Sequence, residues 1–320
     1  RFRKSLYNKL STDDARPLFH RAIMAQYPPG STWKMLIALA GLQEGVIDEN
    51  STFLCVGGFQ IGNHFINCHG SHGNVAVRRA IQGSCNAFFN QLSIKLGFDK
   101  FYEYGTMFGF GQESGIDIPN EQTGLLPSRK YLTDRYGGNA VSKGRMANFG
   151  IGQGEILVTP LQMAVYTATI ANNGRYMQPH SVSAILNHYT NKKENVSYKS
   201  HQIPIENKYF ELVKKAMFDV VNTGGGTAGS ARLDDIDVCG KTGTAENPHG
   251  KDHSWFVCFA PYEKPEIALA VFVENAGFGG SVAAPISKEF LKAYFTPDSL
   301  RENKPAPDQF PLDSAQIANN

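Results

Sequence analysis

The chain has 320 residues, of which 42% are hydrophobic, and its net charge is +2. This composition is sufficient for one large domain or two smaller ones, and it gives no sign of nucleic-acid binding. No run of about 18 apolar residues is present, so we expect no membrane span. A start at Arg1 without a signal-peptide pattern indicates a domain excised from a longer protein.

The N-terminal part predicts one buried helix after an irregular start. Residues 1–26 are polar, with Ser11 to Asp14 as a candidate helix start. Two prolines and a glycine at 28–30 then interrupt any preceding element. The run from Ser31 to about Glu44 is apolar on all sides, which is typical of a helix inside a domain, and Gly45 suits its C-terminal cap.

The segment from about residue 50 to 205 predicts a mostly helical inserted subdomain. We expect loops over 50–74 and 111–154. The glycine cluster at 150–154 predicts a tight turn, because no strand-to-helix dinucleotide pattern surrounds it. Thr159 followed by Pro160 is typical of a helix start. The predicted helices of this segment span residues 75–83, 86–96, 99–108 and 160–172.

The C-terminal third predicts an antiparallel sheet between two helices. Residues 206–221 carry apolar side chains at helical spacing, and 282–295 predict a closing helix. Short polar turns separate three strand-like runs, which favours a meander. These runs span residues 236–244, 255–260 and 267–273.

Five cysteines are an odd number, which argues against a fully paired disulfide framework. Cys239 and Cys258 lie in strand-like runs and are expected to be buried thiols. A cross-strand disulfide between them is the alternative. Residues 297–320 are rich in Pro, Asp and Asn and predict a mobile tail.

Ser31 and Lys34 are the first candidate catalytic pair. They lie three residues apart at a predicted helix start, so the hydroxyl and the amine share one face at the positive end of the helix dipole. A serine needs a nearby base to become a nucleophile, and a lysine is that base only when its pKa is lowered. Alone, this pair is better explained by a serine N-cap and a solvated lysine.

Two later motifs favour the catalytic interpretation. Ser84-Cys85-Asn86 and Lys241-Thr242-Gly243 follow Ser31-x-x-Lys34 in the order found in penicillin-recognising acyl-transferases. The sequence segments around these motifs are YPPGSTWK, GSCNAFFNQ, GIGQGEILVTPLQMA and GKTGTAE. With these segments, the chain resembles the transpeptidase domain of class B penicillin-binding proteins from about residue 18 to 295. The resemblance is closest to the elongation-type penicillin-binding protein 2 group.

The resemblance implies an α/β (α+β) fold like that of penicillin-binding proteins and serine β-lactamases over residues 1–296, with an antiparallel sheet flanked by helices. It implies a peptidoglycan D,D-transpeptidase of cell-wall elongation that β-lactams acylate. Ser31 would be the nucleophile and Lys34 the base, which Lys241 would help to keep neutral. Ser84 would relay a proton, Asn86 would hold the substrate backbone, and Lys241 and Thr242 would bind the substrate carboxylate. Gly243 would leave room for an extended substrate, and the backbone N–H groups of Ser31 and Thr244 would stabilise the oxyanion.

The same resemblance implies where the protein works and with what. Its partners would be peptidoglycan stem peptides, β-lactam antibiotics and a membrane-embedded glycosyltransferase. The domain would be periplasmic and belong to an inner-membrane-anchored protein whose anchor and pedestal are absent from this chain. A serine β-lactamase and a β-lactam sensor domain are the alternative functions. Class A β-lactamases use a deacylating glutamate, typically with asparagine four residues later, and no glutamate here has one.

Cys55, Cys68, His72 and Cys85 are candidate ligands of a structural zinc ion. Cys68 and His72 have a spacing that can bring sulfur and nitrogen to one metal, and the loop from 55 to 72 has no hydrophobic pattern to hold it. The resemblance supports the site, because some elongation-type penicillin-binding proteins carry zinc at matching positions, with aspartates for two of the cysteines. The competing ligands are His64 and His69, and the alternative is a Cys55–Cys68 disulfide with a lone buried Cys85.

Overall fold

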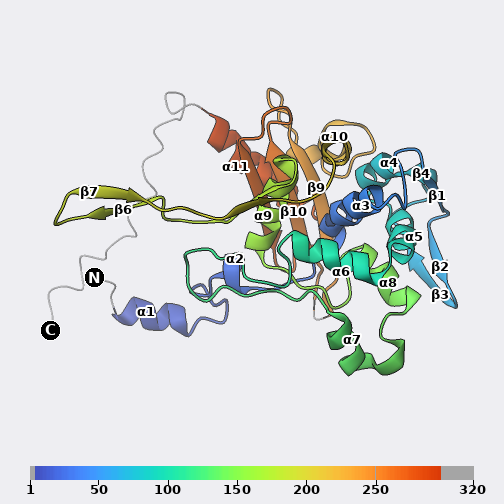
Figure 1. The fold of residues 1–320 in the computed structure, drawn as a ribbon, viewed down its shortest axis with the longest axis horizontal. Coiled ribbons are helices and arrows are strands. Elements are labelled where there is room, and N and C mark those ends of the chain that lie inside the picture. The colour runs from blue at the N-terminus through green and yellow to red at the C-terminus, as the bar shows by residue number, and fades with distance from the viewer. Residues whose placement is uncertain (1–3, 249, 297–320) are drawn as a thin grey trace.

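A three-stranded antiparallel sheet with the order β11-β10-β9 lies at the centre of the computed structural model, which describes residues 4–248 and 250–296 (Figure 1). Its strands are β9 (Cys239–Ala245), β10 (His253–Ala260) and β11 (Ile267–Val273). In the register of the sheet, Val257 of β10 pairs with Lys241 and Ala270. The predicted meander is therefore confirmed, and β9 is left at an edge of the sheet.

Three helices pack against this sheet. α9 (Pro160–Ala171) and α11 (Ala283–Phe295) contact β10 and β11, and α10 (Asn207–Asn222) contacts β9. α9 begins with the expected cap, in which the Thr159 side chain accepts from the backbone of Gln162 and the Gln162 side chain accepts in return. The predicted apolar face of α10 is buried, namely Phe210, Val213, Met217, Val220 and Val221.

The most deeply buried helix is α3 (Lys34–Gln43). Every residue from Lys34 to Leu42 is buried, because the helix has no polar face and is enclosed by α5 (Asn86–Leu96), α6 (Phe98–Met107) and α10. Gly45 follows it with φ +65°, as its predicted role at the helix end requires. This helix fixes Lys34 in the interior next to the sheet.

The remaining elements are short, and four pairs of strands form small hairpins or two-stranded sheets. The pairs are β1 (Thr52–Cys55) with β4 (Gly73–Ala76), β2 (Gly58–Ile61) with β3 (His64–Asn67), β5 (Arg175–Met177) with β8 (Ser200–Gln202), and β6 (Ala184–Asn187) with β7 (Lys192–Asn195). β6 and β7 project away from the body (Figure 1). The other helices are α1 (Lys4–Ser11), α2 (Arg21–Met24), η1 (Gly30–Trp33), α4 (Val77–Gln82), α7 (Arg129–Tyr136), η2 (Gly137–Asn139), α8 (Lys143–Gly150) and η3 (Gly229–Ala231).

Three expectations about irregular segments were wrong. Residues 4–11 form α1, so Ser11 ends a helix instead of beginning one, and α2 also lies within the segment expected to be irregular. The stretch 111–154 contains α7 and α8, which begin where the side chains of Ser128 and Ser142 accept from backbone N–H groups. Loops were predicted there because glycines and polar residues are frequent in this stretch, although a serine cap begins each of the two helices. The expected loop over 50–74 holds the hairpins of β1 to β4.

Cys239 and Cys258 are free thiols with no exposed surface. Cys239 pairs with Phe259 and Cys258 pairs with Gly240, so the two cysteines are not direct cross-strand partners. The expectation of two buried core thiols is confirmed. The predicted tail over 297–320 lies outside the described residues. Among the helices that are described, none is both long and apolar enough to cross a bilayer.

Candidate active site

Ser31 lies on a tight turn that packs directly against the sheet. The turn is η1, one 3₁₀ turn before α3, and it contacts β9. Gly30 has φ +56° and donates a backbone hydrogen bond to Gly152 O at 2.9 Å. A Cβ at Gly30 would lie 2.5 Å from Thr244 O, so only glycine fits this approach. The glycine cluster at 150–154 thus forms a turn, as expected, and this turn supports η1, the turn that carries Ser31.

Lys34 is held in the interior by the loop between α4 and α5. Its Nζ donates to Ser84 O at 2.8 Å and to Asn86 Oδ1 at 2.7 Å. Burial lowers the pKa of Lys34 to about 8, although the charges of Cys68 and Cys85 partly oppose this effect. Among the described contacts no hydrogen bond joins Lys34 to the Ser31 hydroxyl. Such catalytic bonds often tighten only when substrate is bound.

Ser84 connects the two buried lysines. Its Oγ lies 3.2 Å from Lys34 Nζ and 2.9 Å from Lys241 Nζ. Its φ of +55° is unusual for a residue other than glycine and directs this side chain at the junction of α4 and α5. Burial and then the charge of Lys34 lower the pKa of Lys241. The lowered pKa of Lys34 is caused by its own burial, without the contribution expected from Lys241.

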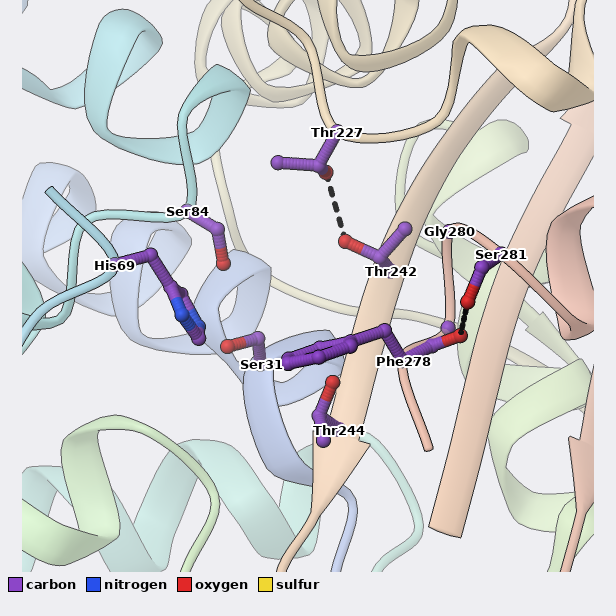
Figure 2. A pocket seen from close by; sticks show the side chains of 10 residues that line it. Ser31, His69, Ser84, Thr227, Thr242, Thr244, Phe278, Gly280 and Ser281 are labelled. Atoms are coloured by element: carbon purple, nitrogen blue, oxygen red, sulfur yellow. Dashed lines mark hydrogen bonds between the residues drawn. The ribbon is translucent and has the colours of Figure 1, made fainter. Parts of the chain in front are cut away.

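A cavity of about 320 Å³ opens beside Ser31 (Figure 2). Ser84, Thr242 and Thr244 line it, as the motifs predicted, whereas Lys241 is fully buried behind the wall. Thr227 also lines the cavity, and its Oγ1 lies 2.7 Å from Thr242 Oγ1. Sequence reasoning missed Thr227, because the preceding Gly224-Gly225-Gly226 run signalled only the end of a helix. It also missed Phe278 as a lining residue.

Gly243 has a packing role that was not anticipated. A Cβ there would lie 2.9 Å from Thr32 Cγ2 and 2.9 Å from Trp255 Cβ. The absence of a side chain therefore lets η1 sit directly on the edge of β9.

Asn86 lies at the other end of the opening. Its Nδ2 donates to Asn67 O at 3.0 Å, while its Oδ1 accepts from Lys34. With Ser31 and Gln153 it lines a second, smaller cavity of about 120 Å³. The three motifs therefore meet around one opening.

Residues 2–292 match the family model of the penicillin binding protein transpeptidase domain. The chain belongs to this family. Among curated relatives it is 34% identical to the peptidoglycan D,D-transpeptidase MrdA of Haemophilus influenzae in an alignment of 309 residues that covers 90% of this chain and 47% of that protein. It is 31% identical to MrdA of Escherichia coli K12, covering 86% of this chain and 47% of that protein. The chain spans about half the length of these relatives.

Solved structures of the family agree with the fold. Pseudomonas aeruginosa PBP2 in complex with WCK 5153 matches with a TM-score of 0.84 and 34% identity, covering 93% of this chain and 65% of that one. PBP2 from a Helicobacter pylori complex with MreC matches with a TM-score of 0.76 and 28% identity, covering 92% and 55%. The resemblance inferred from the motifs and the predicted fold class are confirmed.

This transpeptidase domain also carries the four predicted metal ligands in one cluster. The donor atoms of Cys55, Cys68, His72 and Cys85 all lie within 4.8 Å of one another. The Sγ atoms of Cys68 and Cys85 are 3.9 Å apart, and His72 Nδ1 lies 3.4 Å from Cys55 Sγ and 3.6 Å from Cys68 Sγ. The competing candidates His64 and His69 are not part of this group.

Backbone N–H groups donate hydrogen bonds to two of the cysteine sulfurs in the cluster. The N–H of Asn86 donates to Cys68 Sγ at 3.2 Å, and the N–H of Phe88 donates to Cys85 Sγ at 3.4 Å. The hydrogen bond with Cys85, followed by backbone donors, lowers the pKa of Cys68, whereas the same bond and then burial raise the pKa of Cys85. Metal binding requires deprotonated sulfur, so the environment of Cys68 suits a ligand. The cluster is able to hold a metal ion.

Proposed function

We propose that this domain is the catalytic part of a peptidoglycan D,D-transpeptidase that cross-links stem peptides during cell-wall elongation. The observation that carries the proposal is the position of Ser84 Oγ between Lys34 and Lys241, at the cavity that holds Ser31. The names of the curated relatives support the same activity.

In the first step, Ser31 Oγ attacks the carbonyl carbon between the two terminal D-alanines. The hydroxyl proton passes to neutral Lys34, and the carbonyl oxygen becomes an oxyanion. The backbone N–H groups of Ser31 and Thr244 are the proposed donors to it. Loss of one such donor typically raises the barrier by about 3 to 4 kcal/mol.

In the second step, the carbon–nitrogen bond breaks and D-alanine leaves. Lys34 returns the proton through the Ser84 hydroxyl to the leaving amine, while Lys241 holds that hydroxyl in place. The hydroxyls of Thr242 and Thr227, which line the cavity, are the proposed hydrogen-bond donors to the carboxylate of the leaving group. An amine of a second stem peptide then attacks the ester, forms the new amide and returns the proton to Ser31.

The test is covalent labelling with a fluorescent penicillin, followed by mass spectrometry of the adduct. Ser31→Ala is expected to lose all label, whereas Ser281→Ala, which removes another hydroxyl from the same cavity, should keep the adduct on Ser31. Label on a different serine would contradict the proposal. Fast release of hydrolysed drug would favour a serine β-lactamase. Labelling without turnover of a D-Ala-D-Ala donor would favour a β-lactam sensor.

We also infer that the cysteine and histidine cluster binds a structural zinc ion. Four ligands at about 2.3 Å in a tetrahedron have sulfur atoms about 3.8 Å apart, close to the 3.9 Å between Cys68 and Cys85. Three sulfurs and one nitrogen are a donor set that zinc favours. When bound, zinc would cross-link the loop before Asn86 and take no part in acyl transfer. Elemental analysis is the test, and less than about a tenth of an equivalent with free thiols at Cys55, Cys68 and Cys85 would contradict it.

The surroundings of the domain are inferred from its relatives. We propose a periplasmic position in an inner-membrane-anchored protein that works with a membrane-embedded glycosyltransferase. The solved complex of Helicobacter pylori PBP2 with MreC supports an assembly of this kind. The division into a catalytic domain with an inserted subdomain at about 50–205 also stays a proposal. Copurification from native membranes tests the partner, and limited proteolysis tests the division.

A further inference from the structure

A larger polar cavity lies beside the candidate active site. It has a volume of about 620 Å³, against about 320 Å³ for the cavity beside Ser31. The segment between β3 and β4 supplies some of its walls, and β4, α4 and the loop after α10 supply the others. We call it the side cavity; Asn74, Arg79, Gln82 and Gly225 are among its lining residues.

The two cavities adjoin along three segments of the chain. Gly83 lines the side cavity, and the next residue, Ser84, lines the cavity beside the nucleophile. Gly225 and Thr227 divide between them in the same way, and His69 lines both. Figure 2 shows His69, Ser84 and Thr227 together on one side of the opening. A ligand that extends past Ser84 on this side therefore reaches the side cavity.

The side cavity carries positive charge. The exposed Arg79 lines it, and no aspartate or glutamate does so within the described parts of the chain. The neighbouring Arg78 is paired, with Nε 2.6 Å from Asp219 Oδ2, whereas Arg79 forms no ion pair with any described residue. A guanidinium offers five N–H donors in a planar fork that matches a carboxylate. The cavity is therefore suited to an anionic ligand, above all a carboxylate.

Gln82 holds two walls of the side cavity together. It is only 4% exposed, and its Nε2 donates to Thr223 Oγ1 at 2.7 Å and to Gly224 O at 2.9 Å. These bonds join α4, which carries Arg79, to the loop that carries Thr227. The position of Arg79 relative to the catalytic cavity is thus set by hydrogen bonds within the chain.

The last step of the proposed reaction needs room on this side of Ser84. The acceptor amine approaches the ester carbon from where the amine of D-alanine departed, because this step is the reverse of acylation with a different amine. An acceptor stem peptide is much larger than D-alanine, so the rest of it must extend beyond the cavity beside Ser31. Such a peptide also carries at least one carboxylate, at its C-terminus.

We propose that the side cavity binds the acceptor stem peptide, with Arg79 holding one of its carboxylates, and so directs its amine to the ester on Ser31. This proposal rests on the proposed transpeptidase function. In the step it serves, the amine nitrogen attacks the ester carbon, the bond from that carbon to Ser31 Oγ breaks, and a proton of the amine returns to the oxygen. A held acceptor makes this attack effectively intramolecular.

The experiment uses the full chain and two synthetic peptides. The donor ends in D-Ala-D-Ala and has its amines blocked, and the acceptor is a stem tetrapeptide with a diamino acid at its third position. The acceptor is made with free carboxylates and with all of them amidated. Mass spectrometry of the cross-linked product gives KM for donor and acceptor. The anisotropy of a fluorescent acceptor gives its Kd for the penicillin-acylated chain, and penicillin labelling gives the acylation rate.

The variants are Arg79→Gln, which removes the charge, and Arg79→Lys, which keeps the charge but not the fork. Arg78→Gln is the matched control. It removes the same charge one residue earlier on α4, where the side chain binds Asp219 and does not line the cavity. Tm is measured for each variant, so that a loss of stability is separated from a loss of acceptor binding.

We expect Arg79→Gln to raise the acceptor's KM and Kd by about tenfold or more, with the acylation rate within about twofold, because acylation precedes acceptor binding. Amidation should weaken the acceptor by a similar factor in the unmodified chain, but by less than about threefold in Arg79→Gln, where the partner is already absent. Arg79→Lys should lie between the two, and Arg78→Gln should bind the acceptor normally.

Unchanged acceptor binding in Arg79→Gln, or an equal effect of amidation with and without Arg79, would overturn the proposal. A higher KM for the donor alone would also overturn it, because the cavity would then hold the donor. The Kd measurement needs no turnover, so it tests the site even where little cross-linked product forms. Absence of any adduct on Ser31 in the unmodified chain would instead overturn the proposed function.

Discussion

The backbone N–H of Asn86 donates a hydrogen bond to Sγ of Cys68 at 3.2 Å. The side chain of the same asparagine accepts from Lys34 Nζ at 2.7 Å. One residue thus joins the cysteine and histidine cluster to the proposed base. The position of Asn86 against Lys34 consequently depends on how firmly the cluster holds the loop before α5.

Removal of metal is expected to weaken both stability and acylation. Treatment with a strong chelator should lower Tm by about 10 °C, because a lost cross-link of several kcal/mol corresponds to about 2–4 °C per kcal/mol in a chain of this size. Acylation by penicillin should slow by about tenfold or more, as Asn86 loses its anchor. Calorimetry and labelling rates measure the two effects.

The control for metal removal is Cys68→Ser, which takes away one ligand. This variant should resemble the chelated protein and should not respond further to chelator. Unchanged Tm and labelling after metal loss, confirmed by elemental analysis, would show that the cluster does not support the site.

Acylation should rise with pH through the pKa of Lys34. Burial lowers this pKa to about 8, and only the neutral amine accepts a proton. The acylation rate should therefore increase about tenfold per pH unit below 8 and level off above it. Stopped-flow labelling from pH 6 to 9 measures this profile, with metal content followed at each pH.

Lys34→Arg is the companion variant for that profile. Arginine keeps the charge but does not deprotonate in this range, so acylation should fall by about 100-fold or more at every pH. A near-normal rate, or a wild-type pH profile in the arginine variant, would rule out Lys34 as the base.

Ser84 offers a way to separate chemistry from backbone conformation. Both Ser84→Ala and Ser84→Gly remove the hydroxyl between the two lysines, and both should slow acylation by about 10²–10⁴-fold. Alanine adopts a φ of +55° only at a cost in free energy, whereas glycine adopts it freely. The glycine variant should therefore be more stable by about 1 kcal/mol. Denaturant unfolding gives the stabilities. Restored acylation in the glycine variant alone would mean that Ser84 acts through conformation.

Gly243→Ala should damage the site through packing. The new methyl group would be 2.9 Å from both Thr32 and Trp255, so η1 and β9 must separate. We expect a loss of about 1–3 kcal/mol in the free energy of unfolding, together with slower acylation. Gly229→Ala is the control, since a Cβ there meets nothing within 4 Å. Equal stability of the two variants would contradict this role.

The elements predicted best were those with strong apolar patterns or clear caps. α9, with Thr159 and Pro160, and the three strands of the sheet were found close to their observed positions. The short helices α7 and α8 were missed, because each spans only eight residues and is surrounded by glycines. Local patterns in such segments are weaker than the tertiary contacts that stabilise them.

The residues of the candidate site also differ in whether the sequence alone could predict them. Ordered motifs identified Ser31, Ser84 and Lys241, since their chemistry depends on residue type and order. Thr227 and Phe278 had no motif, because only the folded chain brings them to the cavity. The burial of Lys241 was also invisible in the sequence, where a lysine in a strand gives no sign of which side it faces.

The cysteine and histidine cluster and the candidate active site differ in the length of the chain loop that each must close. Cys55 and His72 are 17 residues apart, as are Cys68 and Cys85, whereas Ser84 and Lys241 are separated by 157 residues. Chain-closure entropy makes the longer loop about 2 kcal/mol more difficult to form. The region around the cysteines can therefore acquire its shape while the chain is still emerging from the ribosome. The two lysines can meet at Ser84 only after β9 has been synthesised, so acylation by penicillin reports the completion of folding.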